Sequence, residues 1–179
     1  MGQEPNIEIL FSSGDIAQRN TDLAEQIAAD MGTDILVIAV LKGSFVFAAD
    51  LIRALHHAGV KPQIDFMALS SYGDKTISSG TVVITRDIMD TVKGRKVLLI
   101  DDILESGRTM EFATRELLSR GAETVKTCLM LDKKGKRVVN FEADFIGFDC
   151  PDLFVIGYGL DYAHYYRELP YIGHITDEQ

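Results

Sequence analysis

The chain has 179 residues, 46% of them hydrophobic, which suffices for one buried core and is too short for two domains of ordinary size. Its formal net charge of −9 argues against a nucleic-acid binder, because such proteins gather Lys and Arg into basic stripes. Charged or Gly-containing segments interrupt each apolar run before the roughly 20 residues of a membrane span. We expect one soluble domain, residues 1–179, with small-molecule partners, no nucleic acid and no membrane.

The N-terminus and the cysteines give no sign of secretion. Met1–Leu10 lacks a basic segment followed by an apolar run. Cys128 lies in a strand-like run and Cys150 just before Pro151, without the spacing of a zinc site. These features predict a cytoplasmic protein with two buried thiols.

The first half of the chain alternates between helical and strand patterns. Apolar residues at helical spacing predict a helix from about Asp15 to Met31 that ends at Gly32. The unbroken apolar run Ile35–Leu41 is typical of a parallel strand covered on both faces. A helix from Phe45 to His57 follows.

Two further strands, at residues 64–69 and 81–85, flank the polar, Gly- and Ser-rich segment Ser70–Gly80. A long polar connection of this kind is a candidate mobile lid, which we expect to be disordered without ligand from about Ser71 to Gly80.

In the second half, a strand at Val97–Ile100, a helix from Thr109 to Arg120 that stops at Gly121, and a strand at Val125–Leu131 repeat the pattern. Recurring strand, helix and strand predict the α/β class, with a mostly parallel central sheet flanked by helices. Ligands then bind at the carboxyl ends of the strands.

The segment from Val97 to Thr109 joins a buried strand, two carboxylates and a small-residue loop that opens a helix. Ser106, Gly107 and Thr109 allow close backbone approach to an anion, which the helix dipole also favours. The adjacent Asp101 and Asp102 suit ribose hydroxyls or Mg²⁺. A sugar phosphate matches both halves, although an ordinary strand-to-helix turn with Thr109 as N-cap explains the loop pattern alone about equally well.

This segment resembles the phosphoribosyl pyrophosphate (PRPP) motif of type I phosphoribosyltransferases: two acids, two apolar residues, an acid, Ser or Thr, Gly, any residue and Thr. Downstream, Asp144–Tyr171 resembles the purine-binding end of the hypoxanthine phosphoribosyltransferases, and Leu41–Ser44 and Ser70–Tyr72 stand where that family keeps its pyrophosphate loop and lid. The resemblance covers nearly the whole chain. It implies the type I fold, with a small hood formed by the terminal segments.

The implied activity is transfer of the 5-phosphoribosyl group from PRPP to hypoxanthine, and to guanine, forming IMP or GMP and pyrophosphate with Mg²⁺. The resemblance also suggests a homodimer or homotetramer. In this family the phosphate loop would hold the 5′-phosphate, and two acids would face the ribose and its metal. Here the loop residues are Glu105, Ser106, Gly107, Arg108 and Thr109, and the acids are Asp101 and Asp102.

The remaining roles are also carried over from the family. Pyrophosphate would meet the Lys42–Gly43 peptide, strained or cis, together with Arg167 and a Mg²⁺ on Asp161. The purine would stack on Phe154 beside the Val155 backbone, Lys133 would donate to its exocyclic oxygen, and Ser71 and Tyr72 would belong to the lid, with Tyr72 at its seal.

Each of these residues also has a structural interpretation. Lys42 can be a solvated lysine in a tight βα turn, and Lys133 can belong to a solvated charged turn. Phe154 can belong to a core strand at 154–156, and Asp161 and Arg167 can be surface charges. The acid that accepts the purine N7 proton is usually Asp in the family, and here it is Glu105. We expect Glu105 to remain the base, with a loop-ordering role as the alternative.

Two rival functions remain open at the level of sequence. Pyrimidine-operon attenuator proteins share the fold and a similar Asp-Asp-x-x-x-x-Gly-Arg-Thr loop, and such a protein would bind RNA. Phosphoribosyltransferases for xanthine or adenine share the sugar-phosphate loop while their base pockets differ. The acidic charge and the segment Asp144–Tyr171 favour the purine enzyme.

Overall fold

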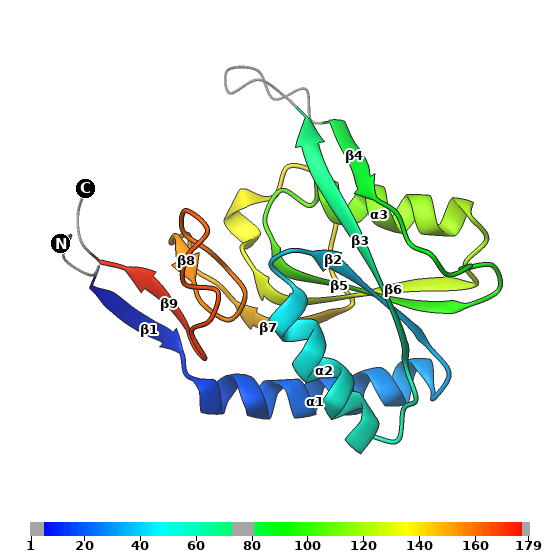
Figure 1. Cartoon of the computed structure of the whole chain (residues 1–179), viewed down its shortest axis with the longest axis horizontal. Helices are drawn as coiled ribbons and strands as arrows, with labels where there is room; N and C mark the ends of the chain where they lie inside the picture. The colour runs from blue at the N-terminus through cyan, green and yellow to red at the C-terminus, as the bar shows by residue number, and fades with distance from the viewer. Residues whose placement is uncertain (1–5, 73–80, 177–179) are drawn as a thin grey trace.

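The computed structural model describes residues 6–72 and 81–176, which form two β-sheets and three α-helices (Figure 1). The larger sheet has the strand order β4-β3-β2-β5-β6-β7, and all its neighbouring strands are parallel except β3 and β4. Its strands are β2 (Leu36–Leu41), β3 (Gln63–Tyr72), β4 (Thr81–Arg86), β5 (Lys96–Leu104), β6 (Thr124–Asp132) and β7 (Phe145–Asp149). The predicted mostly parallel sheet is confirmed.

Helices cover both faces of this sheet. The helices α1 (Ser13–Met31) and α2 (Phe45–His57) pack together on one face, and α3 (Arg108–Ser119) packs on the other. Within β2, Val37 and Ala39 join the core under α1 and α2, whereas Leu36 and Ile38 join the core under α3. Because successive side chains of a strand point to opposite faces, burial on both sides explains the unbroken apolar run.

The helix ends follow local capping chemistry. Ser12 and Asp15 form a capping box at the start of α1, and Gly32, at φ 82°, follows its last residue. The structural alternative, in which Thr109 is the N-cap of α3, is wrong: Gly107, in the left-handed conformation at φ 84°, is the N-cap. A residue without Cβ adopts this conformation at little cost.

A three-stranded antiparallel sheet forms the hood, from β1 (Ile7–Phe11), β9 (Ile172–Ile175) and β8 (Val155–Ile156). In Figure 1 it lies to one side of the central sheet, near both chain ends. Ile7 of β1 pairs with Ile175 of β9, so the hood joins opposite ends of the chain, as the family resemblance implied. The periodicity that identified the central strands did not reveal these short segments.

The expectation of two buried thiols is confirmed. Cys128 and Cys150 are both buried, and desolvation raises the pKa of the Cys128 thiol well above its ordinary value. Among the described residues, no helix combines the length and apolar character required to cross a bilayer.

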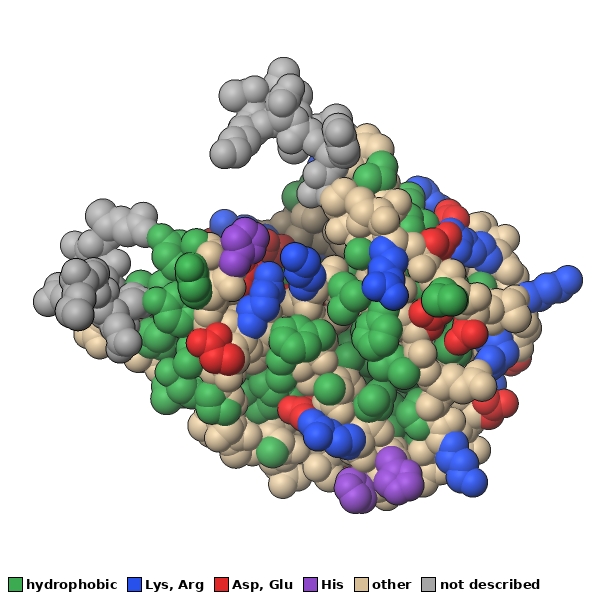
Figure 2. All heavy atoms as spheres, viewed as in Figure 1, with side chains coloured by type: hydrophobic (Ala, Val, Ile, Leu, Met, Phe, Trp, Pro, Cys, Tyr) green, Lys and Arg blue, Asp and Glu red, His purple; other side chains and the backbone are tan. Residues whose placement is uncertain are grey.

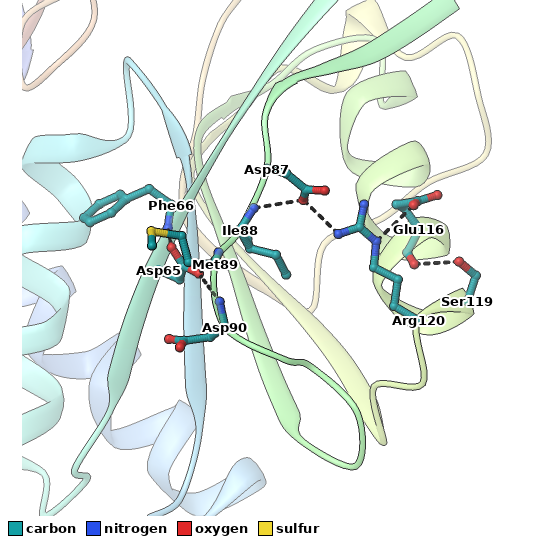
Figure 3. Close-up of polar contacts among 9 residues, drawn as sticks. All are labelled: Asp65, Phe66, Asp87, Ile88, Met89, Asp90, Glu116, Ser119 and Arg120. Atoms are coloured by element: carbon teal, nitrogen blue, oxygen red, sulfur yellow. Dashed lines mark hydrogen bonds and ion pairs between the residues drawn. The ribbon is translucent and has the colours of Figure 1, made fainter.

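The connection from β4 to β5 is held by two carboxylates (Figure 3). Asp65 of β3 accepts hydrogen bonds from the backbone N–H groups of Phe66 at 2.7 Å, Met89 at 2.6 Å and Asp90 at 2.9 Å. Asp87 accepts from Arg120 at 2.8 Å, which ties the same connection to the end of α3. Burial would raise the pKa of Asp65, but the N–H donors outweigh it and lower the pKa.

We predict that Asp65→Asn lowers the free energy of unfolding by about 1–2 kcal/mol at neutral pH, because charge-assisted hydrogen bonds weaken. Because the pKa of Asp65 is lower in the folded protein, its carboxylate stabilises the fold at pH values above the unfolded-state pKa of about 3.9. This stabilisation disappears as the pH falls through the folded-state pKa. Urea unfolding from pH 7 to pH 3 should therefore show the two proteins converging in acid. Asp90→Asn is the control, since it leaves its backbone donor in place; an equal loss in both variants contradicts the prediction.

Candidate active site

Asp101 and Asp102 lie near the carboxyl end of β5, at the edge of the sheet where β2 and β6 also end. β5 runs to Leu104, further than predicted, so both acids belong to the strand. Both are half-buried. Desolvation, followed by the neighbouring Asp102 charge, raises the pKa of Asp101 well above its usual range. Desolvation also raises the pKa of Asp102, although hydrogen bonds and the charge of Arg167 partly offset the rise.

Within the part of the chain that the structure describes, neither carboxylate of this acidic pair forms an ion pair, and the charge of Arg167 acts on Asp102 from a longer distance. Carboxylates that are removed from water without a counter-charge favour ribose hydroxyls or a cation. Within residues 6–72 and 81–176, no group of three acids, histidines or cysteines is positioned to hold a metal. Mg²⁺ commonly binds through one or two carboxylates, waters and substrate oxygens, so this pair fits a substrate-bound Mg²⁺.

The predicted phosphate loop lines a hollow of about 170 Å³ between the end of β5 and the start of α3. Asp101, Glu105, Ser106, Gly107 and Thr109 are among its lining residues. The first amides of a helix lack intrahelical acceptors and carry partial positive charge, which suits a phosphate. The structure therefore brings the proposed loop together with Asp101, whereas Asp102 lies against Gly43.

A second segment supports this loop from behind. Val138 and Val139 donate backbone hydrogen bonds to the Ser106 carbonyl at 2.9 and 3.2 Å, and Arg137 donates to the Glu105 carbonyl at 2.6 Å. A Cβ atom on Gly107 would lie 2.9 Å from the Val139 side chain. Sequence reasoning missed this support, because 137–141 has no motif of its own.

The loop after β2 lies against Asp102. A Cβ atom on Gly43 would lie 1.6 Å from the Asp102 carboxylate, so only glycine allows this approach. The structure has a cis peptide, as the resemblance suggested, but between Leu41 and Lys42 instead of between Lys42 and Gly43. The predicted pyrophosphate loop thus stands beside the acidic pair.

Arg167 reaches the same edge from the segment between β8 and β9. It donates to the Gly159 carbonyl at 2.5 Å and forms an ion pair with Asp161 at 2.8 Å. The other carboxylate oxygen of Asp161 accepts from the His164 N–H at 2.9 Å. Asp161 is therefore engaged by protein donors and does not converge with Asp101 and Asp102 in a group of three ligands among the described residues.

Lys133 and Glu105 form an ion pair at 2.8 Å, with the Lys133 side chain 8% exposed and the Glu105 side chain 48% exposed. The alternative of a solvated Lys133 is therefore wrong, whereas its neighbour Lys134 is exposed and pairs with Asp149. A lysine at this depth requires a partner for its charge. The longer side chain of Glu105 reaches that partner.

Phe154 is 59% exposed, so it does not belong to the core strand that the alternative proposed. Its ring makes an edge contact with Tyr162, at a centroid distance of 5.7 Å, and Val155 beside it is buried in β8. Aromatic side chains that remain exposed together are unusual, so this pair is a candidate stacking site.

Figure 2 shows basic and acidic side chains near the hollowed upper rim of the molecule, between the hood and the central sheet.

The lid lies largely outside the described residues. Ser71 and Tyr72 are the last residues of β3, and the predicted disorder at 71–80 falls mainly on positions that the structure does not describe.

The site also includes Gly159, which sequence reasoning did not single out. A Cβ atom there would lie 2.1 Å from the Gly43 carbonyl. The two glycines around Tyr158 were the available signal.

Comparisons with known proteins agree with this geometry. Residues 6–163 match the family model described as the phosphoribosyl transferase domain. The chain is 39% identical to a hypoxanthine-guanine phosphoribosyltransferase of Dictyostelium discoideum over 173 residues, which covers 96% of each chain.

Two solved structures are similar throughout. A hypoxanthine-guanine phosphoribosyltransferase from Bacillus anthracis is 41% identical, with a TM-score of 0.89 over 97% of this chain and 100% of that one. A Trypanosoma cruzi hypoxanthine phosphoribosyl transferase, studied for the role of its C-terminal region in oligomeric state and activity, is 37% identical, with a TM-score of 0.90 over 98% and 94%. With the fold, the site and these similarities in agreement, the chain belongs to the phosphoribosyl transferase family, in its hypoxanthine-guanine phosphoribosyltransferase branch.

Proposed function

We propose that this chain, acting as one domain, transfers the 5-phosphoribosyl group of PRPP to hypoxanthine or guanine and releases IMP or GMP and pyrophosphate. The observation that carries the proposal is the double placement of Glu105. Its backbone belongs to the phosphate loop, and its carboxylate meets Lys133 at 2.8 Å. One residue therefore adjoins both a candidate phosphate site and a candidate base site, as a nucleotide product requires.

The sugar-phosphate half rests on the loop and the acidic pair. Residues 105–109 hold the 5′-phosphate through backbone amides and the hydroxyls of Ser106 and Thr109. Asp101 and Asp102 face the ribose hydroxyls and hold a Mg²⁺ together with substrate oxygens. When bound, Mg²⁺ neutralises charge on the pyrophosphate leaving group.

The leaving-group half rests on Lys42, Gly43 and Arg167. Gly43 lies against the Asp102 carboxylate, and the charge of Arg167 acts on the same carboxylate. The bond from C1′ to pyrophosphate breaks while a purine nitrogen forms its bond to C1′ from the opposite face. Positive charge develops on the ribose, and fixed charges and precise placement supply most of the rate enhancement. Asp161, which pairs with Arg167, would supply a further ligand to Mg²⁺ together with substrate oxygens.

The base half rests on Phe154, Val155, Lys133 and Glu105. Phe154 stacks on the purine, Val155 lines its edge through the backbone, and Lys133 donates to the exocyclic oxygen. The Glu105 carboxylate accepts the proton from N7 as the base bonds to C1′. Ser71 and Tyr72, at the end of β3, belong to the lid that the family resemblance implies, whose role is to exclude water.

The rival functions receive less support. An RNA-binding regulator would require a basic surface, whereas the chain carries a formal net charge of −9. An adenine enzyme would require an acceptor for the exocyclic amino group, whereas Lys133 only donates. We further propose a cytoplasmic enzyme that works as a homodimer or homotetramer, since oligomeric state is a property studied in the Trypanosoma cruzi protein.

We predict that activity depends absolutely on Mg²⁺ or Mn²⁺, because the acidic pair and the pyrophosphate both carry negative charge. IMP formation should stop after exhaustive EDTA treatment and return when Mg²⁺ is added back. Full turnover in EDTA would show that the protein neutralises the leaving group alone.

We predict that Glu105→Gln lowers kcat by about 10²–10⁴-fold, the usual contribution of a general base, with a much smaller effect on PRPP affinity because the loop amides remain. Steady-state kinetics with saturating PRPP measure the change. Glu123→Gln, on the opposite edge of the sheet, is the control. If kcat stays within a few-fold, the base lies elsewhere.

The experiment that tests the proposed function is kcat/KM for hypoxanthine, guanine and adenine with PRPP. Hypoxanthine and guanine should react, and adenine should be slower by about 10⁴-fold, because its amino group would face the donor Lys133 in a desolvated pocket. Lys133→Ala should erode this ratio, and Lys134→Ala, its exposed neighbour, should not. Adenine turnover equal to that of hypoxanthine in the unsubstituted protein refutes the 6-oxopurine assignment. Unchanged selectivity in Lys133→Ala removes Lys133 from the base site.

A further inference from the structure

Tyr158 occupies an unusual backbone position behind the candidate site. It has φ 51° and is 4% exposed, between Gly157 at φ 91° and Gly159 at φ 99°. A residue with a side chain rarely adopts a positive φ, and for a bulky aromatic residue this conformation is unfavourable. Interactions elsewhere must therefore hold Tyr158 in place.

Those interactions are two hydrogen bonds of its hydroxyl. Tyr158 donates to Asp50 of α2 at 2.7 Å and accepts from the Asn20 side-chain amide of α1 at 2.8 Å. Desolvation and the bond to Asp50 raise the pKa of Tyr158, so the hydroxyl keeps its proton. The side chain thus joins the turn to both helices on this face of the sheet.

The turn that Tyr158 anchors contacts the leaving-group side of the site. Gly159 lies so close to the Gly43 carbonyl that a Cβ atom would stand 2.1 Å from it. The Gly159 N–H donates to the Arg167 carbonyl at 3.0 Å, and its carbonyl accepts from the Arg167 guanidinium at 2.5 Å. Arg167 in turn is close enough to Asp102 to lower its pKa.

The helix α2 connects the two ends of this arrangement. It begins directly after the Gly43–Ser44 loop and carries Asp50 about one and a half turns further on. The turn at 157–160 is therefore attached to one rigid element at two points, through Gly159 on the loop and through Tyr158 on Asp50. Removing the second attachment leaves the turn held by the Gly159 contact and by the backbone hydrogen bonds of Tyr158 and Gly159 to the Leu169 and Arg167 carbonyls.

We propose that Tyr158 is a positioning residue that aims Arg167 at the pyrophosphate, through the hydrogen bonds to Asp50 and Asn20. The proposal rests on the proposed function, in which Arg167 contacts the leaving group. Tyr158 touches no substrate and acts only through Gly159 and Arg167. Removing the Tyr158 hydroxyl should weaken the binding of ligands that carry pyrophosphate and leave the binding of other ligands unchanged.

The test compares Tyr158→Phe, which removes the hydroxyl and keeps the ring, with Tyr165→Phe, which removes a hydroxyl from a 73% exposed side chain. Calorimetry with Mg²⁺ measures the dissociation constants of PRPP, pyrophosphate and IMP. Tyr158→Phe should weaken PRPP and pyrophosphate by about 5- to 10-fold, the effect of about one lost hydrogen bond. IMP binding should stay within two-fold, and Tyr165→Phe should change none of the three.

A double mutant separates positioning from general stability. If Tyr158 acts through Arg167, the PRPP affinity of Tyr158→Phe/Arg167→Gln should equal that of Arg167→Gln alone. If the two effects multiply, or if Tyr158→Phe weakens IMP as much as PRPP, the proposal is overturned. Should Tyr158→Phe fail to fold, Asp50→Asn keeps an acceptor oxygen and should show the same selective weakening on a smaller scale. Failure of the unsubstituted protein to bind PRPP would refute the proposed function instead.

Discussion

The candidate site depends on close backbone approach between loops that leave the same edge of the central sheet. Gly43 lies against the Asp102 carboxylate, Gly159 against the Gly43 carbonyl, and Gly107 against the Val139 side chain. At each place a Cβ atom would come within 3.0 Å of its neighbour. The loops at Gly43 and Gly159 therefore pack together against the end of β5, and the loop at Gly107 packs on the segment that contains Arg137, Val139 and Phe141.

This packing determines the electrostatics. Loops pressed together at a strand end remove water from Asp101 and Asp102, and desolvation is the largest cause of their raised pKa values. The Lys133 side chain, which follows the end of β6, is 8% exposed, and Glu105 balances its charge. The site therefore has two unlike halves: the acidic pair Asp101 and Asp102, and the buried Lys133 with Glu105. A nucleotide also has two unlike parts, a sugar phosphate that binds metal and a neutral base.

Sequence patterns predicted five strands of the central sheet, because strands buried on both faces, such as β2, read as unbroken apolar runs, but they did not predict β7. They missed the hood, whose short strands become stable only by pairing across the length of the chain, as Ile7 does with Ile175. The N-cap of α3 was also missed, since Thr109 is a good local cap while Gly107 is selected by tertiary packing against Val139.

The motif residues themselves could be located from sequence, whereas their partners could not. The Glu105–Lys133 ion pair joins residues from two strand ends, and Arg137 braces Glu105 from the following connection. Tyr158 carries no motif, and only the flanking glycines hinted at its backbone conformation. Such contacts depend on which loops the sheet order brings together, and a single sequence does not encode that order locally.

A crystal structure of the protein with IMP is the most direct test of the claim that these loops form one nucleotide site. We predict that the 5′-phosphate binds the amides of residues 105–109 and that the ribose hydroxyls lie at Asp101 and Asp102. The purine should stack on Phe154, with its exocyclic oxygen at Lys133. Nucleotide density in another cleft, or with the base on the 105–109 loop, would contradict it.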